Sequence, residues 1–334
     1  MLCYVDDALP GITRKRHGRY WQYFDAKGKR ISGREEIDRL NAIGLPPAYI
    51  NAWFCPSPHG HIQAIGYDDK GRKQYRYHLD FRARQEAAKY DRCSGFGRAL
   101  PLLRARVEED MADRKLSREA VVAAVVRLLD LGRVRVGNEQ YAEANKSFGA
   151  TTLRSRHVKV LGRTVKMRFP AKSGVMRELS ITDRNLTRLV RKCQDLPGQN
   201  LFQYVDDEGE AQPVTSSDVN SYIRDAMGDE FTAKHFRTWG ASAIAFEAIC
   251  KAGEKGISLK QMLEPVAEAL GNTPAISRKS YVHPALVDAV KDGADNPLGD
   301  LQCPRATKYL SGSERGLIEF LESADKPARK SKAA

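Results

Sequence analysis

The stretch Ser117-Arg-Glu-Ala-Val-Val-Ala-Ala-Val-Val-Arg-Leu-Leu-Asp-Leu-Gly132 carries the clearest structural signal in the chain. Its apolar residues recur at the spacing of one helical face: Val121, Val122, Val125, Leu128 and Leu129. Ser117 is a residue type that caps helix N-termini, and Gly132 is one that ends helices. The stretch therefore predicts a helix with one apolar stripe between these two residues.

Two further helices are predicted closer to the C-terminus. Thr215 and Asp218 mark the start of one, with an apolar face and Gly228 after its end. Residues 258–270 predict the other, stopped by Gly271.

Residues 158–180 interrupt the helical pattern. Val165, Met167 and Phe169 alternate with charged residues, which is the period of a half-buried strand. Glycine-containing turns at 161–163 and 172–174 bracket this segment, so a short antiparallel sheet is predicted.

The first part of the chain has a different texture, rich in Tyr, Gly and Pro and poor in helical periodicity. Strands are predicted at residues 20–24, 62–67 and 74–77, the first two followed by Asp- and Gly-containing turns. These patterns predict an α+β fold: a small β-rich N-terminal domain (residues 1–85) and a mainly α-helical domain (86–312) containing a small antiparallel sheet. Residues 313–334 form a C-terminal segment that ends, from Asp325, in a basic and disordered tail.

Composition limits the classes of partner. The 334 residues carry 55 Lys+Arg against 42 Asp+Glu, a net charge of +13, which favours a polyanion such as nucleic acid. The alternative is an ordinary basic enzyme. Six cysteines without a Cys-x-x-Cys pair, no signal peptide and no membrane-spanning stretch predict a cytoplasmic protein.

Motifs for nucleotide or metal chemistry are incomplete. Gly132 and Gly137 have the glycine spacing of a phosphate loop, but Asn138 and Glu139 replace its Lys and Ser/Thr. His59 and His61 have no third ligand nearby. The sequence predicts no nucleotide, no metal and no cofactor.

Four short segments place a basic or hydroxyl side chain beside structured elements: Arg135, Lys172, Arg237 and Tyr281. Each alone has an ordinary explanation as a surface charge, a turn lysine or a core-edge aromatic. The four segments become informative when they are considered together and in order.

The segments that carry this set resemble the type IB DNA topoisomerases, in particular the compact poxvirus-like and bacterial branch. Residues 135–154 are similar to the first-arginine motif of that family, Lys234-His-Phe-Arg-Thr-Trp239 to the second, and 271–281 to the nucleophile segment. Gln74-Tyr-Arg-Tyr77 resembles a DNA-contacting strand. The resemblance runs from about residue 10 to about residue 310.

The resemblance implies a mechanism on supercoiled duplex DNA. Tyr281 attacks a backbone phosphate and forms a 3′-phosphotyrosyl bond, which is later resealed without ATP or metal. Arg135 and Arg237 clamp the phosphate oxygens. Lys172, made less basic by partial burial beside cations, donates a proton to the leaving 5′-oxygen.

Further roles follow from the same resemblance. Many relatives have histidine where this chain has Asn272, so a catalytic Asn272 donates a hydrogen bond instead of shuttling a proton. Contacts with DNA are expected from Gln74, Tyr75, Tyr77, Tyr141 and Lys234; Lys234 is also expected to assist proton transfer. The enzyme is expected to be a monomer associated with the nucleoid, with two domains that close around DNA and a flexible link near residues 80–90.

Two alternatives remain at this stage. A tyrosine recombinase has a similar catalytic set but joins strands at special sites as a tetramer; the Arg135 motif and the β-rich N-terminal domain favour the topoisomerase. A non-enzymatic DNA-coating protein explains the charge and the basic tail, but not four ordered catalytic-type segments.

Overall fold

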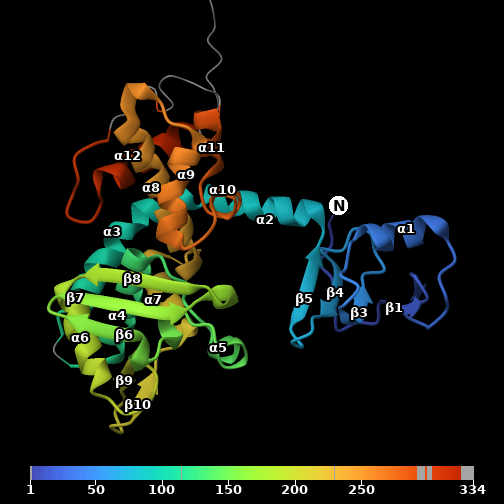
Figure 1. Cartoon of the computed structure of the whole chain (residues 1–334), viewed down its shortest axis with the longest axis horizontal. Helices are drawn as coiled ribbons and strands as arrows, with labels where there is room; N and C mark the ends of the chain where they lie inside the picture. Colours follow the sequence, from blue (N-terminus) through green and yellow to red (C-terminus); the bar gives the residue numbers. More distant parts are fainter. Residues whose placement is uncertain (1, 114, 229, 292–297, 299–302, 325–334) are drawn as a thin grey trace, which may run out of the picture. The chain divides into compact units, whose positions relative to one another are not determined.

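The computed structural model describes residues 2–113, 115–228, 230–291, 298 and 303–324 (Figure 1). The chain divides into two compact units, residues 1–89 and 90–334, where the sequence predicted a boundary at residue 85. The predicted basic tail at 325–334 lies outside the described residues. Among the helices of the described part, none is long and apolar enough to cross a membrane.

The N-terminal unit is built on an antiparallel sheet with strand order β2-β1-β3-β4-β5. The strands are β1 (Ile12–His17), β2 (Tyr20–Phe24), β3 (Ile50–Phe54), β4 (Ile62–Tyr67) and β5 (Lys73–Tyr77). The predicted strands are confirmed as β2, β4 and β5, whereas β1 and β3 were not predicted. In β1 only Ile12 is buried, so the strand shows no alternation of apolar and polar residues.

Helix α1 (Arg34–Ala42) corrects the expectation that this unit lacks helical periodicity. Its apolar face is short, because only Leu40 is fully buried. Leu40 belongs to one small core with Tyr23 and Phe54 of the sheet, and Ile37 packs against that core. Burial against the sheet therefore supports a helix that its own apolar pattern is too short to predict.

Helix α2 (Leu79–Asp91) occupies the stretch where a flexible link was expected. None of its residues is buried. The backbone of this stretch is a continuous helix, and whether it acts as a flexible link stays a prediction.

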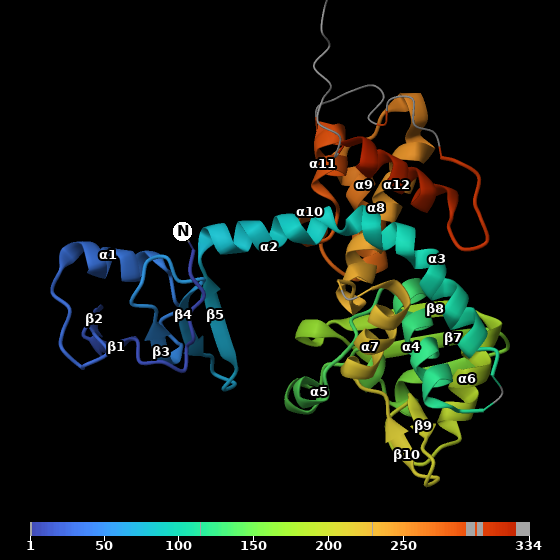
Figure 2. The ribbon, with the colours of Figure 1, turned by 180° about the vertical axis from the view of Figure 1, so that it is seen from behind.

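Helix α4 (Arg118–Gly132) forms the centre of the second unit (Figures 1 and 2). The Ser117 hydroxyl accepts a hydrogen bond from the backbone N–H of Ala120, which confirms the predicted cap. The expected single stripe is wrong, because residues 120–126 are all buried. Helices and strands surround α4, so it has no solvent face along this stretch. The left-handed cap is Arg133 (φ 51°), just after Gly132.

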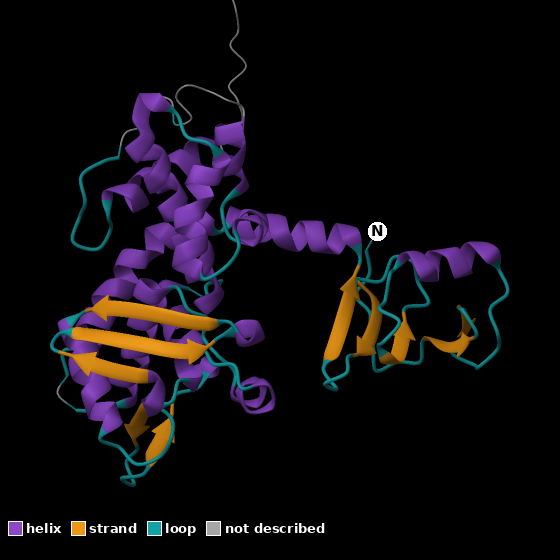
Figure 3. Cartoon of the chain, viewed as in Figure 1, coloured by secondary structure: helices purple, strands orange, loops and turns teal. Residues whose placement is uncertain are grey.

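The predicted sheet of this unit is confirmed as β6 (Val158–Leu161), β7 (Thr164–Pro170) and β8 (Met176–Thr182), antiparallel in that order (Figure 3). Gly162 turns the chain between β6 and β7 with φ 59°. Ser173 (φ 65°) and Gly174 (φ 75°) turn it between β7 and β8. Two consecutive left-handed residues suit the twist of a tight hairpin.

Helices make up most of the rest of this unit. They are α3 (Cys93–Asp110), α5 (Glu139–Asn145), α6 (Arg184–Gln194), α7 (Ser216–Met227), α8 (Ala233–Ala252), α9 (Leu259–Leu270), α10 (Pro274–Ser280), α11 (Pro284–Lys291) and α12 (Gly312–Ala324), with a small hairpin of β9 (Gln203–Val205) and β10 (Ala211–Pro213). Helices α7 and α9 confirm the helices predicted to begin at Thr215 and to span residues 258–270.

A buried ionic network joins four of these helices. Arg104 of α3 lies 2.8 Å from Asp130 of α4 and 2.7 Å from Glu314 of α12. The indole N–H of Trp239 on α8 donates to Glu314 at 3.1 Å. These charge-assisted hydrogen bonds fasten α12 to the body of the unit.

Candidate active site

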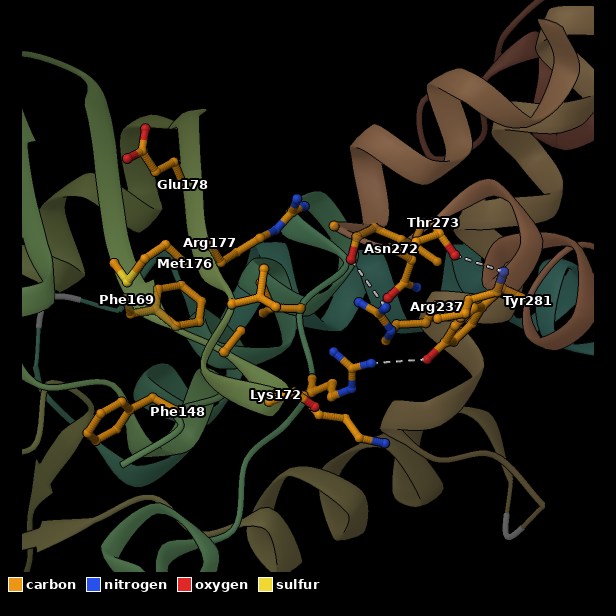
Figure 4. A pocket seen from close by; sticks show the side chains of 18 of the residues that line it. Phe148, Phe169, Lys172, Met176, Arg177, Glu178, Arg237, Asn272, Thr273 and Tyr281 are labelled. Carbon is orange, nitrogen blue, oxygen red and sulfur yellow. Dashed lines mark hydrogen bonds between the residues drawn. The ribbon is translucent and has the colours of Figure 1, made fainter. Parts of the chain in front are cut away.

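A cleft of about 650 Å³ in the second unit brings together all five residues expected to be catalytic (Figure 4). Its walls come from the loop after α4, the β7–β8 turn, helix α8 and the segment from α9 to Tyr281. The five residues are Arg135, Lys172, Arg237, Asn272 and Tyr281. Stretches that are distant in sequence therefore meet at one place.

Arg135 lies in the loop between α4 and α5, and backbone contacts fix that loop. The N–H of Ala150 donates to the Arg135 carbonyl at 2.8 Å, and the N–H of Thr151 donates to that of Val136 at 2.7 Å. The chains cross closely at Gly149, where an added Cβ would lie 2.6 Å from the Arg135 carbonyl oxygen. This crossing holds the Arg135 backbone at the edge of the cleft.

Arg237 comes from the first turns of α8 and is only 5% exposed. Its Nη1 donates to the carbonyl of Arg133, and its Nη2 donates to that of Leu270 at 3.3 Å. The left-handed backbone of Arg133 belongs to the cap of α4. Burial lowers the pKa of Arg237, an effect that the nearby Tyr281 opposes.

Tyr281 follows α10 and faces both arginines. Nη2 of Arg135 lies 3.3 Å from the Tyr281 hydroxyl oxygen, and the guanidinium carbon of Arg237 lies 4.7 Å from the ring centroid. Burial alone would raise the pKa of Tyr281, but the charges and hydrogen bonds of Arg237 and Arg135 outweigh it and bring the pKa below the ordinary value. The two arginines therefore stabilise the phenolate form of Tyr281 by more than burial destabilises it.

Lys172 lies on the β7–β8 turn and lines the same cleft. The side chain is exposed, which corrects the expectation that Lys172 is partly buried. The cause is the hairpin, whose turn projects beyond the core. Figure 4 shows Lys172 along the edge of the cleft that also holds Tyr281.

Asn272 lies directly after α9, beside Arg237. With the amide oxygen turned toward Arg237, that oxygen accepts from Nη2 at 3.1 Å and the amide nitrogen donates to the Gly271 carbonyl at 3.2 Å. The amide thus contacts a guanidinium that lines the cleft, which is compatible with a role as hydrogen-bond donor or acceptor and not as an acid or base.

The residues expected to contact DNA lie elsewhere. Tyr141 on α5 and Lys234 on α8 belong to the second unit but do not line the cleft. Tyr75 and Tyr77 of β5 are exposed, with rings stacked at 5.8 Å and 11°. The amide of Gln74 donates to Asp68 at 3.0 Å, in the turn before β5.

Arg177 on β8 also lines the cleft, and the sequence reasoning did not find it. A signal was present. Arg177, Leu179 and Ile181 alternate with exposed residues, so a charged residue occupies an inward position of the strand. A charge at such a position commonly has a specific partner.

Comparisons with known proteins agree with this architecture. A model described as the catalytic core of eukaryotic DNA topoisomerase I matches residues 78–295, and one described as the N-terminal domain of bacterial DNA topoisomerase IB matches residues 20–68. A DNA topoisomerase 1B of Acanthamoeba polyphaga mimivirus is 32% identical over 289 residues, which cover 82% of this chain and 85% of the relative.

Two relatives with lower sequence identity are also DNA topoisomerases. A DNA topoisomerase 1B of vaccinia virus is 22% identical over 68% of this chain and 72% of its own. A DNA topoisomerase 1 of Mycosarcoma maydis is 23% identical over 63% of this chain but only 23% of its own. The N-terminal antiparallel sheet and the mostly helical second unit are consistent with the catalytic core of the topoisomerase IB class. The chain belongs to the type IB DNA topoisomerase family, and the predicted resemblance is confirmed.

Proposed function

We propose that this topoisomerase relaxes supercoiled duplex DNA by cutting and resealing one strand through Tyr281. The hydroxyl oxygen of Tyr281 attacks a backbone phosphorus, the bond from phosphorus to the 5′-oxygen breaks, and a 3′-phosphotyrosyl ester forms. The phenol proton leaves to solvent. Resealing reverses these steps, since the tyrosyl ester conserves the energy of the broken bond.

The observation that carries this proposal is the approach of two guanidinium groups to one phenol. Arg135 reaches the Tyr281 hydroxyl at 3.3 Å, and Arg237 lies over the ring at 4.7 Å. A phosphate bound beside them would receive charge-assisted hydrogen bonds that strengthen as negative charge develops on its oxygens.

Lys172 is proposed as the group that protonates the leaving 5′-oxygen. It lines the same cleft on a turn built from two left-handed residues. An alkoxide is a poor leaving group, so proton donation to it is worth about 100-fold or more in rate. Asn272 is proposed to hydrogen-bond a phosphate oxygen.

Contacts away from the cleft are proposed to hold the duplex. The exposed, stacked Tyr75 and Tyr77 offer phenol groups to the DNA backbone, with Gln74 beside them, and Tyr141 and Lys234 act in the second unit. A single chain carries the whole catalytic set, which supports a monomer.

The test is plasmid relaxation in EDTA without nucleotide, with wild type and Tyr281→Phe compared directly. Wild type is expected to relax the plasmid to completion, while Tyr281→Phe binds DNA and leaves supercoiling unchanged. A strict requirement for magnesium or ATP, or relaxation by Tyr281→Phe, would overturn the proposal.

A further inference from the structure

Arg177 reaches from the Lys172 hairpin to the C-terminus of α9. Its Nη1 donates to the carbonyl of Glu268 at 3.0 Å, and its Nη2 donates to the carbonyl of Ala269. Both carbonyls belong to the last turn of α9, where helical carbonyls lack partners within the helix. One side chain therefore joins the hairpin that carries Lys172 to the helix that leads into Asn272 and Tyr281.

The end of α9 is shaped to accept this guanidinium. Gly271 caps the helix in the left-handed conformation (φ 60°), which glycine adopts without strain. An added Cβ at Gly271 would lie 3.0 Å from Nη1 and 3.2 Å from Cδ of Arg177. Arg237 takes the next carbonyl, that of Leu270, so two cations meet the negative end of the helix dipole.

The placement of Arg177 combines an electrostatic cost with the two carbonyl contacts that offset it. Burial and the neighbouring charges of Arg133 and Arg135 lower its pKa. Leu179 and Ile181 occupy the equivalent inward positions further along β8, so Arg177 is a charged residue in a row whose other members are apolar. By contrast, Arg168 on the same hairpin is exposed and pairs with Glu178 at 3.0 Å.

The tip of the hairpin depends on contacts such as this one. Residues 172–176 are exposed, and the turn is closed by its own bonds, from Gly174 N–H to the Ala171 carbonyl and from Ala171 N–H to the Val175 carbonyl. Those bonds fix the shape of the turn but not its place relative to α9. Arg177 supplies that second constraint.

We propose that Arg177 is a positioning residue for strand cleavage, which docks the Lys172 turn on the end of α9 and sets the distance from the Lys172 amine to the phosphate attacked by Tyr281. The inference rests on the proposed function. Without Arg177, the amine samples positions from which it does not reach the 5′-oxygen, and leaving-group protonation becomes slow. The reaction of Tyr281 with the phosphorus itself is retained.

The experiment compares single-turnover cleavage of two duplex oligonucleotides, one with the ordinary 5′-oxygen at the scissile phosphate and one with sulfur there. A thiolate leaves without protonation because thiols have a pKa of about 8.5. Arg177→Met is expected to be about tenfold or more slower on the oxygen substrate, and close to wild type on the sulfur substrate. Lys172→Ala is expected to show the same pattern.

Matched variants separate positioning from folding. Arg168→Met, at the exposed arginine of the same hairpin, is expected to match wild type on both substrates. Arg177→Lys keeps the charge but cannot span two carbonyls, so an intermediate cleavage rate on the oxygen substrate and a normal rate on the sulfur substrate are expected. This variant tests the inference in case Arg177→Met is too unstable to assay. Thermal unfolding is measured for every variant alongside its cleavage rates.

Two results would overturn the role of Arg177 but leave the proposed function standing. One is a cleavage rate of Arg177→Met or Arg177→Lys equal to wild type on the oxygen substrate, and the other is a defect as large on the sulfur substrate as on the oxygen substrate. If wild type forms no covalent product, or Lys172→Ala is not rescued by sulfur, the proposed function fails and this inference falls with it. The two failures are therefore distinguishable in one set of assays.

Discussion

The guanidinium carbon of Arg237 lies 4.7 Å from the ring centroid of Tyr281, so a cation that is itself almost fully buried stacks on the ring of the proposed nucleophile. The hydroxyl of the same tyrosine points to a second cation, Arg135, at 3.3 Å. Positive charge thus approaches both the face and the tip of one phenol. This arrangement is compatible with a group that must become anionic in order to react.

A shift in the pH profile is expected when one of these cations is removed. The pKa of Tyr281 lies below its ordinary value of about 10 because Arg237 and Arg135 outweigh burial. Cleavage should therefore rise with pH and level off below about 10 in wild type. In Arg135→Ala one lowering influence is lost, so the midpoint should move to higher pH. Single-turnover rates on the sulfur substrate measure this without a contribution from Lys172; equal midpoints would contradict the account.

Asn272 gives a prediction about residue chemistry. Its amide can accept from Arg237 at 3.1 Å, so a hydrogen-bonding side chain is expected to be needed at this position. Asn272→His should keep much of the cleavage rate, whereas Asn272→Ala should lose it. Rates of covalent-adduct formation check this, and near-normal rates in both variants would show that the Asn272 side chain takes no part in cleavage.

The close chain crossing at Gly149 gives a prediction about the Arg135 loop. In Gly149→Ala the new Cβ would lie 2.6 Å from the Arg135 carbonyl oxygen, so the backbone on one side must move. We expect at least about a tenfold loss of cleavage, since shifts of about 1 Å in catalytic groups cost up to 100-fold. Gly95→Ala is the matched control, because its Cβ would make an ordinary contact at 3.5 Å and alanine favours a helix. Equal cleavage rates in Gly149→Ala and Gly95→Ala would contradict the prediction, because they would show that the loop accepts the new Cβ without displacing Arg135.

The buried carboxylate of Glu314 predicts a stability change. Breaking its pair with Arg104 by Glu314→Gln is expected to lower the free energy of unfolding by about 3 kcal/mol at neutral pH. Burial raises the pKa of Glu314, but its hydrogen bond and charge pairing with Arg104 bring the pKa below its usual value. That stabilisation is complete above the unfolded pKa of about 4.3 and is lost as the pH falls through the lower folded value.

The difference between wild type and Glu314→Gln should therefore shrink in acid. Urea unfolding at neutral and acidic pH measures it, with Arg98→Gln as a control, since Arg98 is an exposed arginine of α3 that pairs with Glu322 of the same C-terminal helix. A difference that grows in acid, or is absent at neutral pH, would contradict the proposed contribution of the pair.

Local signals explain which elements could be predicted. The residues that begin α7, those that end α9 and those that alternate in β7 each lie within a short stretch of sequence. Each of these signals can therefore be recognised without knowledge of distant elements. Helix α1 was missed because its burial depends on a sheet whose strands lie before and after it in the sequence. The burial of α4 on all sides likewise depends on distant elements.

The residues of the site differ in the same way: some carry a local signal in the sequence and others depend on distant elements. Arg135, Arg237, Asn272 and Tyr281 stand in segments long enough to resemble a family. Lys172 stands on the turn after a predicted strand, and the cleft holds all five residues. Arg177 lies in no such motif, and its partner Glu268 is 91 residues away. Its contact with the end of α9 becomes visible only when that helix is placed against β8.

The central claim is that Tyr281 is the residue that becomes bonded to DNA. Duplex oligonucleotides mixed with the enzyme in EDTA and stopped with SDS should give a covalent adduct. After protease digestion, mass spectrometry should find nucleotide joined through a 3′-phosphate to the peptide that contains Tyr281, and Tyr281→Phe should give none. An adduct on any other residue, a 5′-phosphate linkage, or an adduct undiminished in Tyr281→Phe would contradict the account.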